Sequence, residues 1–186
     1  MKHIGIHIGE MYASREPALI ETILGSCVAV CLFDPVARIG GMNHILLPKR
    51  QQQDPELARY GEHAIPMLIE RILKLGGTLD HMQAKIFGAA NVLLMEGKHI
   101  NVPRANEHFA REYLRSRTIP VIAERLGGRH ALKVRMYTAT GKALVRALPR
   151  TQENNLVVRE GKQYFAALHR RWGWFDAGVA LREGPH

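Results

Sequence analysis

A cysteine that follows a glycine-containing bend is the residue of this sequence best placed to do chemistry. Gly25, Ser26 and Cys27 come just before the apolar run 28–33, so the thiol stands at the end of an expected strand, where a substrate can reach it. Such a bend can also turn main-chain N–H groups toward a developing oxyanion. Most free cysteines are small buried hydrophobes instead, and a thiol becomes a nucleophile only when something stabilises its thiolate.

A histidine on the next expected strand can supply that stabilisation. A neighbouring imidazole favours the thiolate and carries its proton. His44 lies inside the apolar segment 38–47, which follows the Cys27 strand through a turn at Asp34 and Pro35. An antiparallel hairpin of the two strands brings Cys27, at the start of one, beside His44, near the end of the other. A histidine satisfied within the core is the competing interpretation.

The second cysteine does not extend this site. In a strand, Cys27 and Cys31 have Cα atoms about 13 Å apart, beyond the roughly 7 Å that a disulfide allows. The same separation disfavours a shared zinc ion, and two cysteines cannot build a four-cysteine zinc fold. We therefore expect no metal and no organic cofactor, and we interpret Cys31 as a core residue.

The hydrophobic patterns predict that strands dominate and that two helices lie between them. Apolar residues predict strands at 4–8, 19–24, 27–33, 38–47, 82–90, 121–123, 133–137 and 143–148, with a hairpin turn at 140–141. A helix is expected through 65–73, with Pro66 in its first turn or kinking its entry, and another begins near Asn106 as N-cap. The polar segment 49–55 is a candidate mobile loop. These elements indicate the α+β class.

Length and composition indicate one main domain. With 186 residues, 46% hydrophobic and 23% charged, the chain has the size and composition of a single globular core. No apolar run approaches the roughly 20 residues of a membrane-spanning helix, and no signal peptide follows Lys2 and His3. We expect a soluble, cytoplasmic protein with a catalytic domain at 1–149 and an aromatic, basic extension at 150–186 that folds back over the core.

The charge is the unusual bulk property. Lysine and arginine number 26 against 17 acidic residues, giving a net charge of +9. That balance fits nucleic acid, an anionic membrane face or an acidic protein. The basic residues are scattered and match no nucleic-acid-binding motif, so we expect neither nucleic acid as a partner nor membrane insertion. A basic nucleic-acid-binding domain, with a steep salt dependence, is kept as an alternative.

Several motifs, in order, resemble the CheD family of chemoreceptor glutamine deamidases. The specific part is the block Gly25-Ser26-Cys27-Val28 with the downstream Met42-Asn43-His44. The similarity continues through 59–61, 85–89, Asn106, 127–128 and 140–142, and spans about 9–145. It implies a mixed α+β structure with packed sheets and flanking helices, similar to thiol deamidases among bacterial toxins. The implied activity is that of a protein-glutamine glutaminase, which hydrolyses glutamine side chains to glutamate and ammonia.

The resemblance also implies a role for each site residue. Cys27 corresponds to the nucleophile and His44 to the general base. The family's third residue is a threonine ahead of the bend; Thr22 is the nearest match, with Glu21 adjacent. Successive strand residues face opposite sides, so only one of them can orient His44, and we favour Thr22. The remaining candidates are expected to position the oxyanion or the substrate: Gly25, Ser26 and Asn43.

The implied partners are methyl-accepting chemotaxis receptors and a chemotaxis phosphatase. Acidic stretches on receptor coiled coils would be attracted by the +9 charge, which predicts electrostatic steering. Two alternatives stay open besides nucleic-acid binding. One is a non-catalytic chemotaxis regulator that binds the phosphatase or the receptor. The other is a related thiol hydrolase, which would reveal itself by acyl transfer to an added amine.

Overall fold

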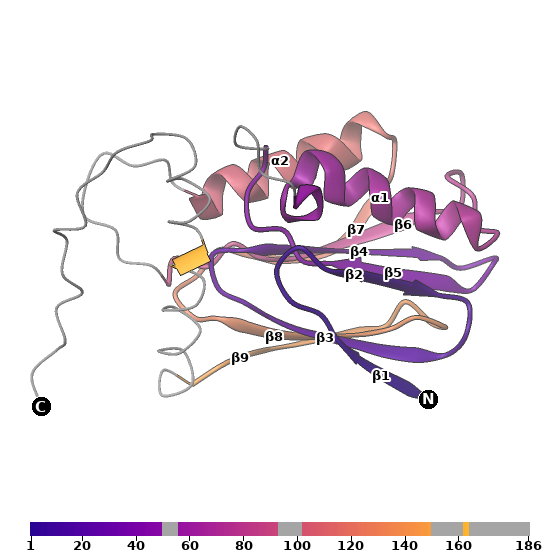
Figure 1. Ribbon diagram of the computed structural model, residues 1–186, viewed down its shortest axis with the longest axis horizontal. Helices are drawn as coiled ribbons and strands as arrows, with labels where there is room; N and C mark the ends of the chain where they lie inside the picture. The colour runs from indigo at the N-terminus through magenta and orange to yellow at the C-terminus, as the bar shows by residue number, and fades with distance from the viewer. Residues whose placement is uncertain (50–55, 93–101, 150–161, 164–186) are drawn as a thin grey trace, which may run out of the picture.

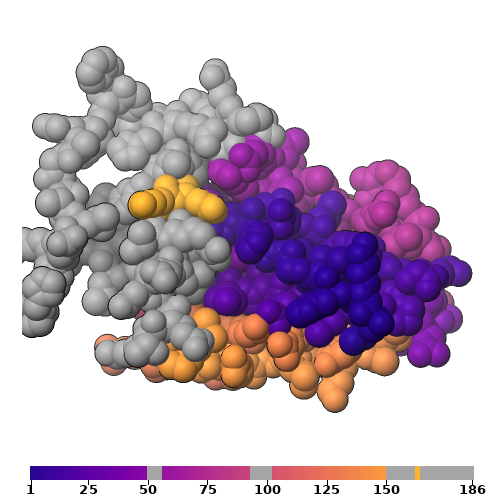
Figure 2. Space-filling view, turned by 60° about the horizontal axis from the view of Figure 1, so that its bottom comes forward, coloured from indigo at the N-terminus to yellow at the C-terminus, as the bar shows by residue number. Residues whose placement is uncertain are grey.

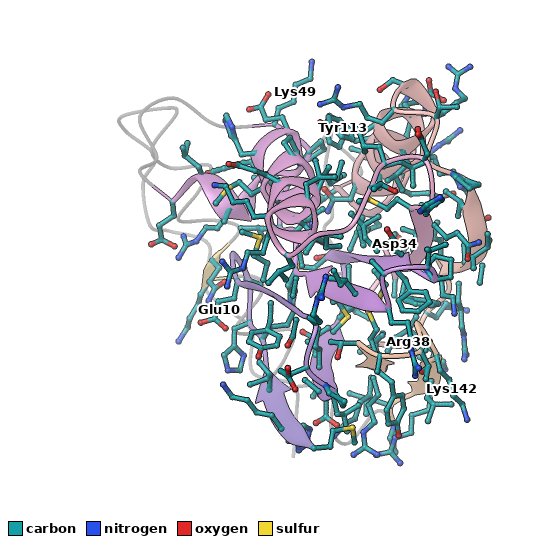
Figure 3. All side chains as sticks on the ribbon, turned by 90° about the vertical axis from the view of Figure 1, so that its right-hand side faces the viewer. Glu10, Asp34, Arg38, Lys49, Tyr113 and Lys142 are labelled. Atoms are coloured by element: carbon teal, nitrogen blue, oxygen red, sulfur yellow. The ribbon has the colours of Figure 1, made fainter. Side chains whose placement is uncertain are left out.

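Two β-sheets lie face to face, and two helices cover the outer face of one of them (Figure 1). The computed structural model describes residues 1–49, 56–92, 102–149 and 162–163. Seen from the end, the layers run from Tyr113 among the helices, through Asp34 in the middle, to Lys142 at the far side (Figure 3). The predicted α+β fold of packed sheets with flanking helices is confirmed.

The two sheets hold nine strands within the described residues. The four-stranded sheet has the order β1 (Lys2–Gly5), β3 (Ala18–Leu24), β8 (Leu132–Tyr137), β9 (Ala143–Ala147). The five-stranded sheet has the order β2 (Met11–Ser14), β5 (Ile39–Asn43), β4 (Val28–Asp34), β6 (Gln83–Gly88), β7 (Val121–Leu126). Neighbouring strands pair antiparallel except β1 with β3 and β6 with β7. The helices are α1 (Gly61–Lys74) and α2 (Val102–Ser116), with a short 3-10 helix, η1 (Leu57–Arg59), ahead of α1.

Alternation along β4 divides the interior into two cores. Val28, Val30 and Leu32 pack against the helices, whereas Ala29 and Cys31 pack between the two sheets. Both faces of β4 are therefore buried, and the strand is a nearly continuous apolar run. The site described below lies in the core between the sheets.

Both helices begin earlier than the sequence predicts. α2 begins at Val102, so Asn106 lies inside the helix and is not its N-cap. Val102 and Asn106 are four residues apart on one buried stripe, which extends the helix by a turn. α1 begins at Gly61, which puts Pro66 in the second turn rather than the first. The strand β2 was not predicted, because its four residues carry no clear alternation.

Some predictions fall outside the described residues. They include most of the candidate loop 49–55 and nearly all of the extension 150–186, so the domain division at 149 stays a prediction. Within the described ranges, no helix is both long and apolar enough to cross a membrane.

Candidate active site

The bend Gly25–Cys27 carries the chain from one sheet to the other. β3, in the four-stranded sheet, ends at Leu24, and β4, in the five-stranded sheet, starts at Val28. The bend is therefore a corner of the sandwich, and Cys27 enters the core between the sheets with none of its surface exposed. The thiol lies just after a bend and at a strand end, as predicted, but it is fully buried, so the expectation that a substrate can reach it there does not hold for this structure.

Two main-chain donors and one side-chain amide hold the carbonyl groups of the bend. The Ala90 N–H donates to the Gly25 carbonyl and the Ala89 N–H to the Cys27 carbonyl, both at 2.8 Å. The Asn106 side-chain amide donates to the Ser26 carbonyl at 3.3 Å. In a trans peptide the N–H points away from the preceding carbonyl. The N–H groups of Ser26 and Cys27 therefore point away from the donors that hold the carbonyls.

Gly88 allows β6 to approach the bend closely. It pairs with Val28 and has φ +115°, in the region that only glycine adopts without strain. A Cβ atom at this position would lie 2.2 Å from the Cys27 carbonyl oxygen. A side chain at position 88 would therefore push the main chain of Cys27 out of place.

The pairing of β4 with β5 puts Cys27 and His44 on one face. The strands are antiparallel, as predicted, and the bridge between Val28 and Ile45 continues their register. This register places His44 opposite Ala29, which is two residues beyond Cys27 on β4. Residues two apart on a strand share a face, so the thiol and the imidazole are diagonal neighbours, with Cα atoms about 7 Å apart.

The loop after β1 holds the main chain of His44. The Gly9 N–H donates to the His44 carbonyl at 2.9 Å, and the His44 N–H donates to the Glu10 carbonyl at 3.0 Å. His44 is 1% exposed, so its ring is confined between the sheets. The orientation of the His44 side chain is thus set by the hydrogen bonds of its main chain and by the core side chains that surround its ring.

Thr22 contacts the His44 ring from the opposite sheet. Its Oγ1 lies 2.8 Å from Nδ1 of His44 and donates to the Ile6 carbonyl, also at 2.8 Å. A threonine hydroxyl has one proton, and a carbonyl oxygen only accepts. The Thr22 proton goes to Ile6, so Nδ1 of His44 must carry a proton and donate to Thr22. In the neutral ring, Nε2 then holds the lone pair and is the basic nitrogen.

Glu21, the alternative to Thr22, lies on the outer face of the four-stranded sheet. Its carboxylate contacts Lys133 Nζ and Arg135 Nε, both at 2.6 Å. Partial burial raises the pKa of Glu21, but the hydrogen bonds and charges of these two bases outweigh it and hold that pKa below its ordinary value. The structure therefore brings Thr22, and not Glu21, to His44.

Asn43 does not join the other candidates. It is fully buried, and its Oδ1 accepts from the Val30 N–H at 2.9 Å while its Nδ2 donates to the Ala64 carbonyl at 3.1 Å. These partners lie on the helix side of the five-stranded sheet, opposite the face of His44. The amide of Asn43 ties β5 to β4 and α1, so its expected role beside the substrate is replaced by a structural one.

Asn106 contacts the site, and the sequence did not assign it there. Besides the Ser26 carbonyl, its Nδ2 reaches the Leu46 carbonyl at 2.9 Å. The signal was present: the buried residues of α2 are Val102, Asn106, Ala110 and Leu114, and one of these four is polar. A polar residue on an apolar helical stripe marks a buried hydrogen-bonding role.

The two cysteines occupy different environments. Cys31 pairs with Met42 on one side and Lys85 on the other and is 1% exposed. Burial raises the pKa of Cys31 from 9.0 to about 12, with a small opposing effect of the Lys85 charge. Cys31 is therefore an inert core thiol near neutral pH.

Within the described residues, no three His, Cys, Asp or Glu side chains gather as a metal site.

This arrangement supports acyl-transfer chemistry through a thiol. A cysteine at the corner of the sandwich shares a face with a histidine whose basic nitrogen is fixed by a threonine. Such a pair can form a thiolate, attack a carbonyl carbon and protonate a leaving amine. The same set suits hydrolysis of an amide or an ester.

Comparison with known proteins gives a family and several relatives. The sequence model of a family described as "CheD chemotactic sensory transduction" matches residues 46–147. This match starts just after His44, so Cys27, His44 and Thr22 lie outside it. The family predicted from the motifs is confirmed.

The relatives carry names of one kind. A protein of Shewanella oneidensis named "Probable chemoreceptor glutamine deamidase CheD 1" is 43% identical over 159 residues, covering 83% of this chain and 76% of that protein. Proteins named "Probable chemoreceptor glutamine deamidase CheD" are similar too. That of Xanthomonas euvesicatoria pv. vesicatoria is 46% identical over 142 residues, which cover 76% of this chain and 71% of that protein. That of Methylobacillus flagellatus is 41% identical over 157 residues, which cover 82% of this chain and 77% of that protein.

Proposed function

This chain belongs to the CheD family, and on that premise we propose that it hydrolyses glutamine side chains of chemoreceptors to glutamate, with Cys27 as the nucleophile. The observation that supports the mechanism most is the shared face of Cys27 and His44, together with the hydrogen bond from His44 to Thr22. The activity and substrate follow the names of the relatives, and the residue roles follow the family resemblance, which the geometry of the site supports.

The first half-reaction forms a thioester. His44 Nε2 takes the proton of the Cys27 thiol, and the thiolate attacks the carbon of the glutamine carboxamide. The carbonyl electron pair moves onto oxygen, where the N–H groups of the Ser26–Cys27 bend would donate to it, each worth about 3 kcal/mol. When the intermediate collapses, the C–N bond breaks, and the proton on His44 goes to the nitrogen that leaves as ammonia.

The second half-reaction restores the enzyme. His44, again neutral, takes a proton from a water molecule, whose oxygen attacks the thioester carbon. The C–S bond breaks and Cys27 recovers a proton from His44, leaving glutamate. The sum is glutamine plus water giving glutamate plus ammonia. Each proton passes through Nε2, the ring nitrogen that Thr22 leaves unprotonated.

Mass spectrometry of a chemoreceptor cytoplasmic fragment tests this proposal. The fragment is incubated with wild type, Cys27→Ala or Cys31→Ala, the last being a matched control because Cys31 is buried on the same strand and burial raises the pKa of its thiol to about 12. Conversion of a glutamine to glutamate adds about one dalton. We expect that gain with wild type and Cys31→Ala only. The same gain with Cys27→Ala would overturn the assigned nucleophile.

Two finer parts belong to this proposal. A cytoplasmic location fits two cysteines that form no disulfide, because reducing compartments keep thiols from oxidising. The second part is that the chain binds a chemotaxis phosphatase. If the chain acts only as a binding regulator, Cys27→Ala keeps its biological effect and the phosphatase still binds. If it acts as a thiol acyltransferase, an added amine appears in the product.

A further inference from the structure

Asn106 breaks the apolar stripe of α2. The buried residues of this helix are four apart, and Asn106 is the polar one of the four. It is 2% exposed, and its Oδ1 is buried with no hydrogen-bond partner among the described residues. An unpaired buried carbonyl is unfavourable, and an aliphatic side chain at this position would avoid it. The presence of a polar side chain at this buried position is therefore explained by the hydrogen bonds of its amide nitrogen.

That nitrogen joins two main-chain segments. Nδ2 donates to the Leu46 carbonyl at 2.9 Å and to the Ser26 carbonyl at 3.3 Å. Both partners are carbonyl oxygens, which fixes the nitrogen of the amide as the atom that faces them. Ser26 directly precedes Cys27, and Leu46 follows His44 by two residues. One NH₂ group thus bridges the segment of the thiol and the segment of the imidazole.

The bridge lies where the two strands part. Val28 and Ile45 exchange main-chain hydrogen bonds, but the N–H groups of Leu46 and Leu47 both turn to the Arg59 carbonyl. β5 therefore leaves β4 at the level of Cys27. The Asn106 amide spans this divergence and holds the Ser26–Cys27 peptide in one orientation.

We infer that Asn106 is a positioning residue that fixes the spacing of Cys27 and His44 through the carbonyls of Ser26 and Leu46. The inference deepens the proposed deamidase function and rests on it for the meaning of that spacing. It assigns α2 a part in catalysis without contact to the reacting atoms.

The test compares Asn106→Ala with Leu114→Ala. Leu114 lies on the same buried stripe and is fully buried, but it packs in the core between the helices and the sheet, away from Cys27. Iodoacetamide, a small carboxamide, reports the reactivity of Cys27 as a function of pH, with mass spectrometry to locate the label. Deamidation of the receptor fragment gives kcat and KM, and thermal unfolding gives the loss of stability.

For Asn106→Ala we expect kcat to fall about tenfold or more with little change in KM, and Cys27 alkylation to shift to higher pH. Leu114→Ala should lower the unfolding temperature at least as much and leave kcat and the alkylation profile within about twofold. Asn106→Ser keeps one donor and should lie in between, which preserves the comparison if the alanine variant does not fold.

The outcomes separate this inference from the proposed function. A wild-type alkylation profile in Asn106→Ala, or an equal shift in Leu114→Ala, overturns the positioning role. Alkylation does not depend on deamidation. If wild type leaves receptor glutamines unchanged while Asn106→Ala still shifts the profile, the deamidase proposal fails and the positioning role stands.

Discussion

At the scale of residues, the hydroxyl proton of Thr22 selects the basic nitrogen of His44. We expect Thr22→Val, which keeps the shape of the side chain and removes the hydroxyl, to lower kcat about tenfold or more, because a hydrogen bond to a group that becomes charged is worth about 1.5–3 kcal/mol. Thr22→Ser keeps the hydroxyl and should keep most of the activity. Nitrogen-15 NMR of the ring gives the tautomer: Nδ1 protonated in wild type and a mixture in the valine variant. A valine variant with the wild-type tautomer and kcat contradicts the assignment.

The buried thiol of Cys31 predicts a pH dependence of stability. Burial raises its pKa from 9.0 to about 12, so above pH 9.0 the unfolded chain releases a proton that the folded chain keeps. Unfolding is then favoured, and the free energy of unfolding falls by about 1.4 kcal/mol per pH unit up to the folded pKa. Below pH 9.0 the thiol is protonated in both states and contributes no slope.

Urea unfolding of wild type and Cys31→Ala, at several values between about pH 8 and 10.5, isolates this effect, since all other groups titrate in both proteins. We expect the difference in unfolding free energy between the two proteins to be constant at the low end. Toward the high end it should move in favour of the alanine variant. A difference that stays flat throughout would mean that Cys31 ionises in the folded chain as readily as in the unfolded one.

Residue types and strand alternation predicted part of the site. They singled out Cys27 and His44 as candidates, and alternation showed that only one of Thr22 and Glu21 can face His44, whereas the preference for Thr22 came from the family resemblance. The same alternation excludes Asn43, since a neighbour of His44 on a strand must face the other way. Asn106 was missed because its contacts are to main-chain carbonyls of segments 60 and 80 residues away along the chain. No local pattern specifies such contacts.

At the scale of elements, β6 supports the main chain of Cys27, the proposed nucleophile, through Gly88. Its φ is +115°, and a Cβ atom would meet the Cys27 carbonyl oxygen at 2.2 Å. We expect Gly88→Ala to lose most of its activity. A positive φ alone costs a non-glycine residue about 1–2 kcal/mol of stability, and the loss should exceed this because the main chain of Cys27 must also move. Activity on the receptor fragment and thermal unfolding measure the two effects.

Gly128 provides the control for backbone strain. Its φ is +84°, and nothing lies within 4 Å of a Cβ atom built there. Gly128→Ala should therefore show the loss of stability due to φ and keep kcat. If both alanine variants keep kcat, Gly88 does not position Cys27 and its contact is only a packing constraint.

The elements themselves were more predictable than their ends. Most strands and both helices were expected from apolar spacing, but the corner at Gly25–Cys27, where the chain changes sheets, depends on pairing between distant strands. β3 pairs with β1 and β8, whereas β4 pairs with β5 and β6. Tertiary packing also moved the starts of α1 and α2 by about a turn, which cap signals alone do not determine.

At the scale of the whole molecule, no helix of the described residues covers the outer face of the four-stranded sheet. Figure 2 shows this side, where the indigo N-terminal strand and the orange β8–β9 segment reach the surface. Among the described residues, Lys133 and Arg135 flank Glu21 on this face, and Arg146 is exposed beside Lys133. On this face the three basic side chains outnumber the one acidic side chain, in keeping with the net charge of +9 of the chain.

That excess charge predicts that salt slows the encounter with an acidic receptor segment. Opposite charges accelerate association at low ionic strength, and the Debye length shrinks from about 30 Å at 0.01 M to about 8 Å at 0.15 M salt. We expect kcat/KM for the receptor fragment to fall as salt rises over this range, with kcat unchanged. Arg146→Glu, which lowers the net charge by two, should flatten the dependence. Alkylation of Cys27 by iodoacetamide, a neutral reagent, controls for effects of salt on the site and should not respond. If kcat/KM is independent of salt, the positive charge has no part in receptor docking, and the glutamines are found through contacts that are not electrostatic.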